Sequence, residues 1–238
     1  LNRIGFITGR GKRSIADHFD ISYELEREIA GSGKEELLTS IRKLIDENEF
    51  AFKRQNHMKG LGHAILSGRY LMGDEPFAVV GNYPYNISSQ IIFKAIENRS
   101  IVHTLVGMFQ LEVAKRICEG PGSKTYGIIS VLVQAYFKTE FMFSLDPFQF
   151  TPPPKVNSGV IKLTRKTQLT LNCDENLFFK IVKTSFQQRR KTIRNSLKVF
   201  NLSNNIKEDV IFGRRPETLG VDDFVHLTNI IANGNIST

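Results

Sequence analysis

Short apolar runs alternate with amphipathic stretches over the first part of the chain. Residues 4–8 and 77–80 are apolar runs bounded by turn-forming residues, and each predicts a buried strand. Residues 34–48 carry apolar side chains three and four positions apart, which predicts an amphipathic helix, and residues 50–53 are expected to be extended. Strands that alternate with helices favour a parallel α/β layer.

The remainder continues this pattern and then changes to helices alone. Proline and glycine residues mark loops at 81–86 and 151–154. We expect helices over residues 88–98, 111–118, 126–136, 175–198, 206–212 and 222–231, and strands over residues 101–109, 137–145 and 156–164. The predicted organisation is an α/β layer over residues 1–168, made of segments 1–78 and 79–168, and a helical domain over residues 169–238.

The charge balance changes near residue 80. Residues 1–78 hold twelve Lys and Arg and twelve Asp and Glu, whereas residues 79–238 hold twenty and twelve and so carry the whole net charge of +8. A basic half predicts a polyanionic partner such as nucleic acid, although a basic surface that only aids solubility gives the same count.

Several classes of protein are disfavoured by features that the sequence lacks. It has no apolar run long enough for a membrane-spanning helix and no charged-then-apolar leader. Two cysteines, Cys118 and Cys173, cannot build a disulfide framework or a paired zinc motif, so we expect a cytoplasmic protein without bound metal. The first residue is Leu1 rather than Met, which indicates a fragment.

Residues 82–85, Asn-Tyr-Pro-Tyr, directly follow the predicted strand at 77–80. Proteins of the α/β class place their ligands at the carboxyl ends of strands. The carboxamide oxygen of Asn82 and the carbonyl before Pro84 can accept hydrogen bonds from the exocyclic amine of a purine, and the ring of Tyr85 can stack on the base. So short a motif also occurs in ordinary turns, so the residues alone leave both interpretations open.

The second candidate region is the basic stretch from Phe186 to Lys198. It contains no acidic residue and five cations, namely Arg189, Arg190, Lys191, Arg194 and Lys198. If this stretch is one helix, Arg190, Arg194 and Lys198 lie four residues apart on one face, where a phosphate backbone can neutralise them. The alternative is a solvated charged surface.

Five sequence blocks occur in order between residues 79 and 234. They are Val80 to Ser88, Phe109 to Ile117, Tyr126 to Val131, Phe150 to Ser158 and Phe186 to Thr192. With these blocks the stretch resembles the ribosomal RNA adenine N6,N6-dimethyltransferase family, which usually has Leu or Ile in place of Tyr83.

The resemblance implies a role for four residues of these blocks. Asn82 and Pro84 would hold the amine of the target adenine, Tyr85 and Phe150 would stack on the base, and Asn82 would also contact the methyl donor, S-adenosylmethionine. The implied protein is a monomer that methylates ribosomal RNA of the small ribosomal subunit. Phe150 has a second interpretation, because Phe141, Phe143, Phe148 and Phe150 alternate as on a sheet face packed against a core.

Residues 1–78 lack the Gly-rich turn on which that family binds its donor, since no G-x-G-x-x-G occurs. Instead, the runs Thr8 to Arg13, Asp17 to Glu26, Lys59 to Ala64 and Gly73 to Val80 resemble the middle of bacterial UTP–glucose-1-phosphate uridylyltransferases. That resemblance implies uracil contacts by Gln55, Gly60 and Gly62, for which a tight turn before a helix is the alternative. The predicted fold is therefore an incomplete Rossmann-like methyltransferase layer of chimeric origin, α/β in class, followed by a small all-helical C-terminal domain.

Three functions follow from these patterns. The leading hypothesis is a ribosomal RNA adenine dimethyltransferase whose activity is impaired because the donor motif is absent. The second is a non-catalytic RNA-binding remnant of such an enzyme. The third, a uridylyltransferase, lacks the metal-binding aspartates expected just after Val80, where Asn82 to Tyr85 stand instead. Since the two segments did not arise with matching core faces, we expect below-average stability.

Overall fold

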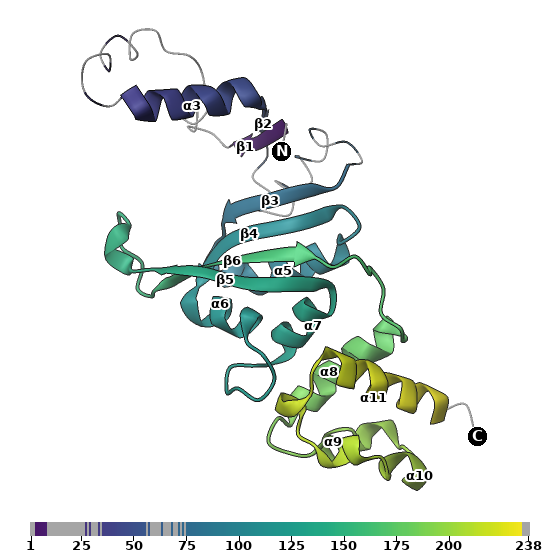
Figure 1. The fold of residues 1–238 in the computed structure, drawn as a ribbon. Helices are drawn as coiled ribbons and strands as arrows, with labels where there is room; N and C mark the ends of the chain where they lie inside the picture. Colours follow the sequence, from purple (N-terminus) through teal and green to yellow (C-terminus); the bar gives the residue numbers. More distant parts are fainter. Residues whose placement is uncertain are drawn as a thin grey trace. The chain divides into compact units, whose positions relative to one another are not determined.

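The computed structural model describes residues 3–8, 27, 29, 33, 35–55, 57, 63, 68, 71, 73 and 75–234 (Figure 1). The chain divides into two compact units, Leu1–Glu75 and Pro76–Thr238. This division lies close to the residue at which the charge balance changes. None of the described helices combines the length and the apolar character that crossing a bilayer requires.

The first unit contains two parallel strands and one helix among its described residues. Strand β1 (Arg3–Thr8) pairs with β2 (Glu49–Arg54), and α3 (Glu35–Glu47) precedes β2. These bounds confirm the strands predicted at 4–8 and 50–53 and the helix predicted at 34–48. The ring of Phe6 stacks on Phe52 with centroids 5.2 Å apart, but no described residue of this unit reaches the burial of a core residue.

The second unit is built on a four-stranded mixed sheet, ordered β3-β4-β6-β5. Strand β3 (Phe77–Asn82) is parallel to β4 (Val102–Gln110), whereas β6 (Ser158–Arg165) is antiparallel to β4 and to β5 (Phe137–Leu145). Parallel strands need a crossover, and α5 (Ser88–Glu97) provides it between β3 and β4. Each end of the four strands lies within two residues of the bound that the sequence predicted.

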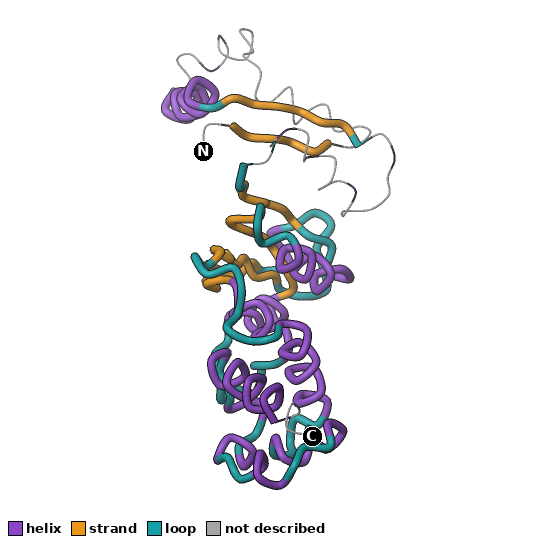
Figure 2. The backbone as a smooth tube through the Cα atoms, turned by 90° about the vertical axis from the view of Figure 1, so that its right-hand side faces the viewer, coloured by secondary structure: helices purple, strands orange, loops and turns teal. Residues whose placement is uncertain are grey.

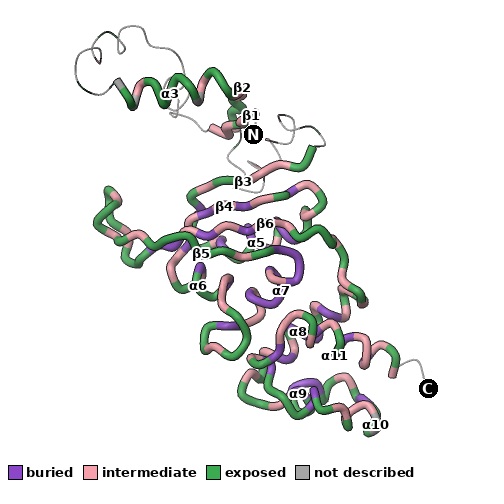
Figure 3. Tube along the Cα trace, in the orientation of Figure 1, coloured by how far each residue is buried: buried purple, intermediate pink, exposed green. Residues whose placement is uncertain are grey.

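Two helices between β4 and β5 contribute much of the core. They are α6 (Leu111–Cys118) and α7 (Ile128–Tyr136), and they pack on each other and on the sheet. Val131, Leu132 and Val133 of α7 are all fully buried, and three successive buried residues show that this helix is covered on more than one side. Alternate residues of β4 and β6, including Leu105, are also buried, and Figure 3 shows the buried positions gathered in these elements.

Residues 175–234 form a cluster of helices (Figure 2). The longest are α8 (Glu175–Gln187) and α11 (Val221–Gly234), and they pack against each other. Shorter elements lie between them: α9 (Ile193–Ser196), η3 (Lys198–Phe200), α10 (Asn204–Lys207), η4 (Val210–Gly213) and η5 (Pro216–Thr218). The single helix predicted over 175–198 is wrong, because α8 ends at Gln187 and Gln188 caps it outside the helical region.

Arg99 connects this helical part to the α/β layer. Its guanidinium donates to Glu175 Oε2 at 2.7 Å and to the carbonyl of Leu169 at 2.6 Å, and it lies 4.3 Å from the ring centre of Tyr136. Arg165 donates in turn to the carbonyl of Arg99 at 2.9 Å. The start of α8 is therefore held to the end of α5 by charge-assisted hydrogen bonds.

Candidate functional site

The motif from Asn82 to Tyr85 forms the loop at the carboxyl end of β3. Asn82 is the last residue of β3 and pairs with Met108 of β4. The side chains of Asn82 and Pro84 are exposed, Tyr83 is buried and Tyr85 is half-buried. The loop thus presents the predicted amide and proline to solvent and turns only Tyr83 into the core.

Tyr83 fills a space between two glycines. A Cβ built at Gly81 would lie 2.9 Å from Cε1 of Tyr83, and one built at Gly107 would overlap the other side of the ring. The ring also lies 5.2 Å from that of Phe109. Its hydroxyl is buried without a hydrogen-bond partner, and burial raises the pKa of Tyr83 above its ordinary value.

Tyr85 is fixed to another part of the sheet by its hydroxyl group. The oxygen lies 2.5 Å from Oγ of Ser158, the first residue of β6, and Ser158 pairs with Gln110 at the end of β4. On the other side, Ser88 Oγ donates to the carbonyl of Tyr85 at 2.9 Å. The loop after β3 and the start of β6 are therefore joined at one end of the sheet.

Phe150 lies on the loop that leads into β6. It follows the short helix η2 (Pro147–Gln149), and the Thr151–Pro152 peptide bond next to it is cis. Its side chain is half-buried, and neither it nor Tyr85 stacks on another aromatic ring of the described residues. Both rings thus keep faces that a base could contact.

The alternating phenylalanines do not pack as one core face. Phe141, Phe143 and Phe148 are 37%, 50% and 81% exposed. The alternative interpretation, a sheet face packed on a core, is wrong for these three residues, because the side chains of such a face would be buried.

The basic stretch differs from the helix that the sequence predicts. Since α8 ends at Gln187, Arg190, Arg194 and Lys198 do not form one stripe on a continuous helix. Arg189 is half-buried, donating to Glu217 Oε2 at 3.3 Å and to the carbonyl of Ser123 at 2.8 Å. Its contacts are therefore those of a residue that holds the helical part together.

The other four cations of the stretch are exposed. Arg194 donates to the carbonyl of Lys207 at 2.7 Å, whereas Arg190, Lys191 and Lys198 have no ion-pair partner among the described residues. These three remain candidates for contacts with phosphate groups.

The described residues of the first unit do not supply the donor site that the resemblance implies. Residues 9–26, which follow β1, and Gly60 and Gly62 lie outside the described residues. Strand β2 ends with Lys53 and Arg54 and is followed by Gln55, whereas the resemblance implies an acidic residue at the end of the second strand to hold ribose hydroxyls. Gln55 Nε2 lies 3.1 Å from Nδ1 of His63. The described end of β2 therefore offers no carboxylate to the ribose of S-adenosylmethionine.

Two contacts of the site were not foreseen from the sequence. The Tyr85–Ser158 hydrogen bond joins residues 73 positions apart, and no local pattern encodes such a pair. The Arg99 cluster was missed for the same reason. The only sequence signal for the first contact was that Tyr85 and Ser158 both belong to blocks shared with one family.

Comparison with known proteins identifies the same family along most of the chain. A sequence profile described as "Ribosomal RNA adenine dimethylase" matches residues 21–233. The Ribosomal RNA small subunit methyltransferase A of Flavobacterium johnsoniae is 58% identical over 158 residues, which cover 66% of this chain and 60% of that protein. The protein of the same name from Phocaeicola vulgatus is 42% identical over 233 residues, covering 91% of this chain and 83% of that protein. The chain thus spans about 60% of the first of these relatives.

The structural comparison supports the fold. A crystal structure of a dimethyladenosine transferase from Plasmodium falciparum matches with a TM-score of 0.66 and 21% identity, covering 96% of this chain and 82% of that chain. A structure of apo UDP-glucose pyrophosphorylase reaches a TM-score of only 0.35, which is too low to support the resemblance of residues 1–78 to uridylyltransferases. The profile match beginning at residue 21 instead includes most of that segment.

Proposed function

This chain belongs to the ribosomal RNA adenine dimethylase family, and we propose that it binds small-subunit ribosomal RNA and holds one of its adenines for methylation of the N6 amine. The observation that carries this proposal is the loop from Asn82 to Tyr85, which is exposed at Asn82 and Pro84 and anchored through Tyr85 to Ser158. A fixed loop with free acceptors is suited to orient a base that has been turned out of its stack.

Each residue of the loop has one role in this proposal. The Asn82 carboxamide oxygen and the carbonyl before Pro84 accept hydrogen bonds from the adenine amine, which favours the pyramidal, more nucleophilic form of its nitrogen. The rings of Tyr85 and Phe150 contact the faces of the base. No side chain needs to act as a general base before the amine attacks, because the reacting lone pair belongs to the adenine itself.

The basic residues of the helical part bind the RNA backbone in this proposal. Arg190, Lys191, Arg194 and Lys198 are exposed and have no carboxylate partner among the described residues. Their contacts with phosphate groups make RNA affinity fall as salt concentration rises. Arg189 contributes through the fold, because its guanidinium is bonded to Glu217 and Ser123.

S-adenosylmethionine is the donor that family membership implies, and the described residues do not provide its site. We therefore expect impaired methyl transfer, with RNA binding retained. The alternative function is an RNA-binding protein without catalysis, and it is favoured by the end of β2, which carries Lys53 and Arg54 where the donor's ribose would need a carboxylate.

Calorimetric titration of the full chain with S-adenosylmethionine is the first test. One-to-one binding, followed by methyl transfer to small-subunit RNA, supports the enzyme. An absence of binding by a folded chain, with salt-dependent RNA affinity intact, supports the RNA-binding alternative.

Replacement of Asn82 then tests the site itself. N82A should abolish any methylation and change RNA affinity by less than about twofold, because a single base contact contributes little beside the phosphate contacts. Methylation at the wild-type rate by N82A would refute the assignment of Asn82.

A dual origin of the chain is part of the proposal. We propose that residues 1–78 and 79–234 have separate origins, because the motifs and the charge balance change within a few positions of the division between residues 75 and 76. The family profile, which matches residues 21–233, spans this junction. Amplification of source DNA across the codons for residues 70–90 tests the proposal. A continuous product shows that both segments are encoded by one gene and contradicts an assembly error, whereas the absence of one shows that the segments are not contiguous in the source and supports separate origins.

A further inference from the structure

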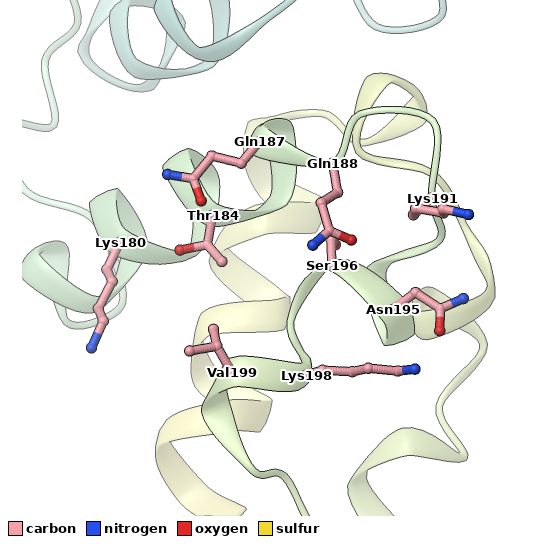
Figure 4. Close-up of a pocket in the computed structure, with 9 residues that line it drawn as sticks. All are labelled: Lys180, Thr184, Gln187, Gln188, Lys191, Asn195, Ser196, Lys198 and Val199. Carbon is pink, nitrogen blue, oxygen red and sulfur yellow. The ribbon is translucent and has the colours of Figure 1, made fainter.

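A cavity of about 510 Å³ lies in the helical part, away from the loop that follows β3. Figure 4 shows α8 along one wall and the segment of α9 and η3 along the other. Lys180, Thr184 and Gln187 face it from α8 at the spacing i, i+4, i+7, which places them on one side of that helix. The remaining lining residues are Gln188, Lys191, Asn195, Ser196, Lys198 and Val199.

All charged side chains that line this cavity are positive. Three of its nine lining residues are lysines and none is acidic, and Lys180, Lys191 and Lys198 form no ion pair with any described residue. The Lys180 ammonium lies 5.2 Å from the ring centre of Phe200, an attractive cation–π position. Three uncompensated cations around one cavity favour an anionic ligand.

The uncharged residues that line the cavity can contact a ligand that carries hydrogen-bonding groups besides its anionic group. Gln187, Gln188 and Asn195 carry carboxamides, which offer donors and acceptors together and match the edges of nucleic-acid bases. Asn195 is oriented by its Nδ2, which donates to Thr192 Oγ1 at 3.1 Å. Among the described residues, the side chains of Gln187 and Gln188 have no hydrogen-bond partner and remain available.

The cavity is also lined by one apolar side chain, that of Val199. Val199 is 70% exposed although it is aliphatic, and it lines the cavity beside Lys198. Such a surface fits the face of a base or a ribose. The volume also lies within the range of small-ligand pockets, which begins at about 300 Å³.

We propose that this cavity binds one nucleotide of single-stranded RNA, distinct from the adenine that is methylated. The inference rests on the proposed RNA-binding function and extends it from backbone contacts to a base-sized pocket. Lys191 and Lys198, whose ammonium groups lie on the same side in Figure 4, take the phosphate. The carboxamides contact the edge of the base, and Val199 contacts its face. A duplex does not fit, because its bases are stacked and cannot enter a cavity singly.

The test is an NMR titration of the full chain with cytidine 5′-monophosphate, cytidine and inorganic phosphate. Cytidine 5′-monophosphate avoids both the adenine and the uracil that other parts of the chain are expected to recognise. We expect it to shift the side-chain amide signals of Gln187, Gln188 and Asn195, and to bind at least about tenfold more tightly than either phosphate or cytidine alone.

Two matched variants locate the binding. Q188E places a negative charge in the cavity, and K183Q changes the net charge of the protein by the same amount on an exposed part of α8 outside the lining. We expect Q188E to weaken cytidine 5′-monophosphate binding at least about tenfold, and K183Q and N82A to change it less than about twofold. Far-ultraviolet circular dichroism of each variant checks its folding.

Three results would overturn the inference: no shift of the three amide signals, equal affinity in Q188E and K183Q, or phosphate alone binding as tightly as the nucleotide. None of these readouts requires methylation. If N82A still methylates RNA, the proposed function of Asn82 fails while the result for the cavity stands.

Discussion

The ring of Tyr83 occupies the space that a side chain on Gly107 would need. A Cβ at Gly107 of β4 would overlap Cε2 and Cδ2 of that ring. The same ring leaves too little room for a Cβ at Gly81 of the neighbouring strand β3. One aromatic side chain thus packs the loop with the candidate site residues against β3 and β4. Its position depends on glycine, which has no side chain, at both Gly81 and Gly107.

Removal of the Tyr83 hydroxyl should stabilise the protein. That oxygen is buried without a partner, and an unsatisfied buried polar group costs about 1–3 kcal/mol. We expect Y83F to raise the free energy of unfolding by about 1 kcal/mol, measured by urea denaturation with unchanged m-value. A loss of stability in Y83F would mean that the hydroxyl has a partner, such as an ordered water.

Addition of a methyl group at Gly107 should do the opposite. G107A forces the Tyr83 ring to move, and overpacking of a well-filled core costs about 1–3 kcal/mol. The double variant G107A/Y83L should recover most of that loss, because the shorter leucine leaves room for the added Cβ. If the two changes are instead additive, the ring does not press on this glycine.

The Arg99 cluster should contribute more than an exposed ion pair. Side chains of Arg99 and Glu175 are both mostly buried, and R99A leaves the carboxylate and the Leu169 carbonyl without their donor. We expect a loss of about 2 kcal/mol in R99A by urea denaturation. K94A, which removes the exposed pair with Glu97, is the control, with less than about 0.5 kcal/mol expected.

Two neighbouring arginines should differ in what they support. R189A should lower the thermal midpoint, because Arg189 is bonded to Glu217 and to the Ser123 carbonyl. R190A should leave that midpoint unchanged and reduce the salt dependence of RNA binding by about one phosphate contact. Equal thermal midpoints for the two variants would contradict the structural role of Arg189.

Alkaline pH should destabilise the fold through its buried tyrosines. Burial raises the pKa of Tyr126 to about 12 and raises the pKa of Tyr83 and Tyr136 as well, whereas an unfolded tyrosine titrates near about 10. Above about pH 10 the unfolded chain therefore releases protons that the folded chain keeps, so the free energy of unfolding falls as pH rises.

The check is a tyrosinate absorbance titration with and without urea. In native protein these three tyrosines should ionise only above the pH at which the urea-unfolded chain has already titrated. Coincident titration curves in the two conditions would show that the rings are accessible to solvent.

Secondary structure could be predicted here where periodicity was strong. The helix at 111–118 and the strand at 137–145 have the bounds that the sequence indicates, since amphipathic and alternating patterns fix them locally. The helix predicted through residue 198 failed, because Gln188 leaves the helical region and the next turn bonds across to Arg214 through the Ile193 amide. Tertiary contacts of that kind override helical spacing.

The sequence indicated candidate residues for the site but not the contacts that hold them. The Asn82–Tyr85 motif follows a strand, as its chemistry suggested, but only the fold shows that Tyr85 is bonded to Ser158. The cavity of the helical part illustrates the same limit. Lys191 and Lys198 belong to the basic stretch, whereas Lys180, Thr184 and Gln187 come from a helix for which the sequence predicted no ligand site.

The order of strands in the second unit has a consequence for how the chain can be shortened. Among the described strands of residues 76–234, β3 is an edge strand, with β4 as its one hydrogen-bonded neighbour. Its Val80 is 75% exposed. Its sequence, Phe-Ala-Val-Val-Gly-Asn, contains no charged residue and no proline. Natural sheets protect their edge strands with charged residues, prolines or bulges. Without such protection, the unpaired backbone N–H and C=O groups of an edge strand can pair with strands of other molecules. A fragment trimmed to begin at Pro76 would therefore tend to associate with its own copies along β3, and charge placed at Val80 would be the way to keep it monomeric.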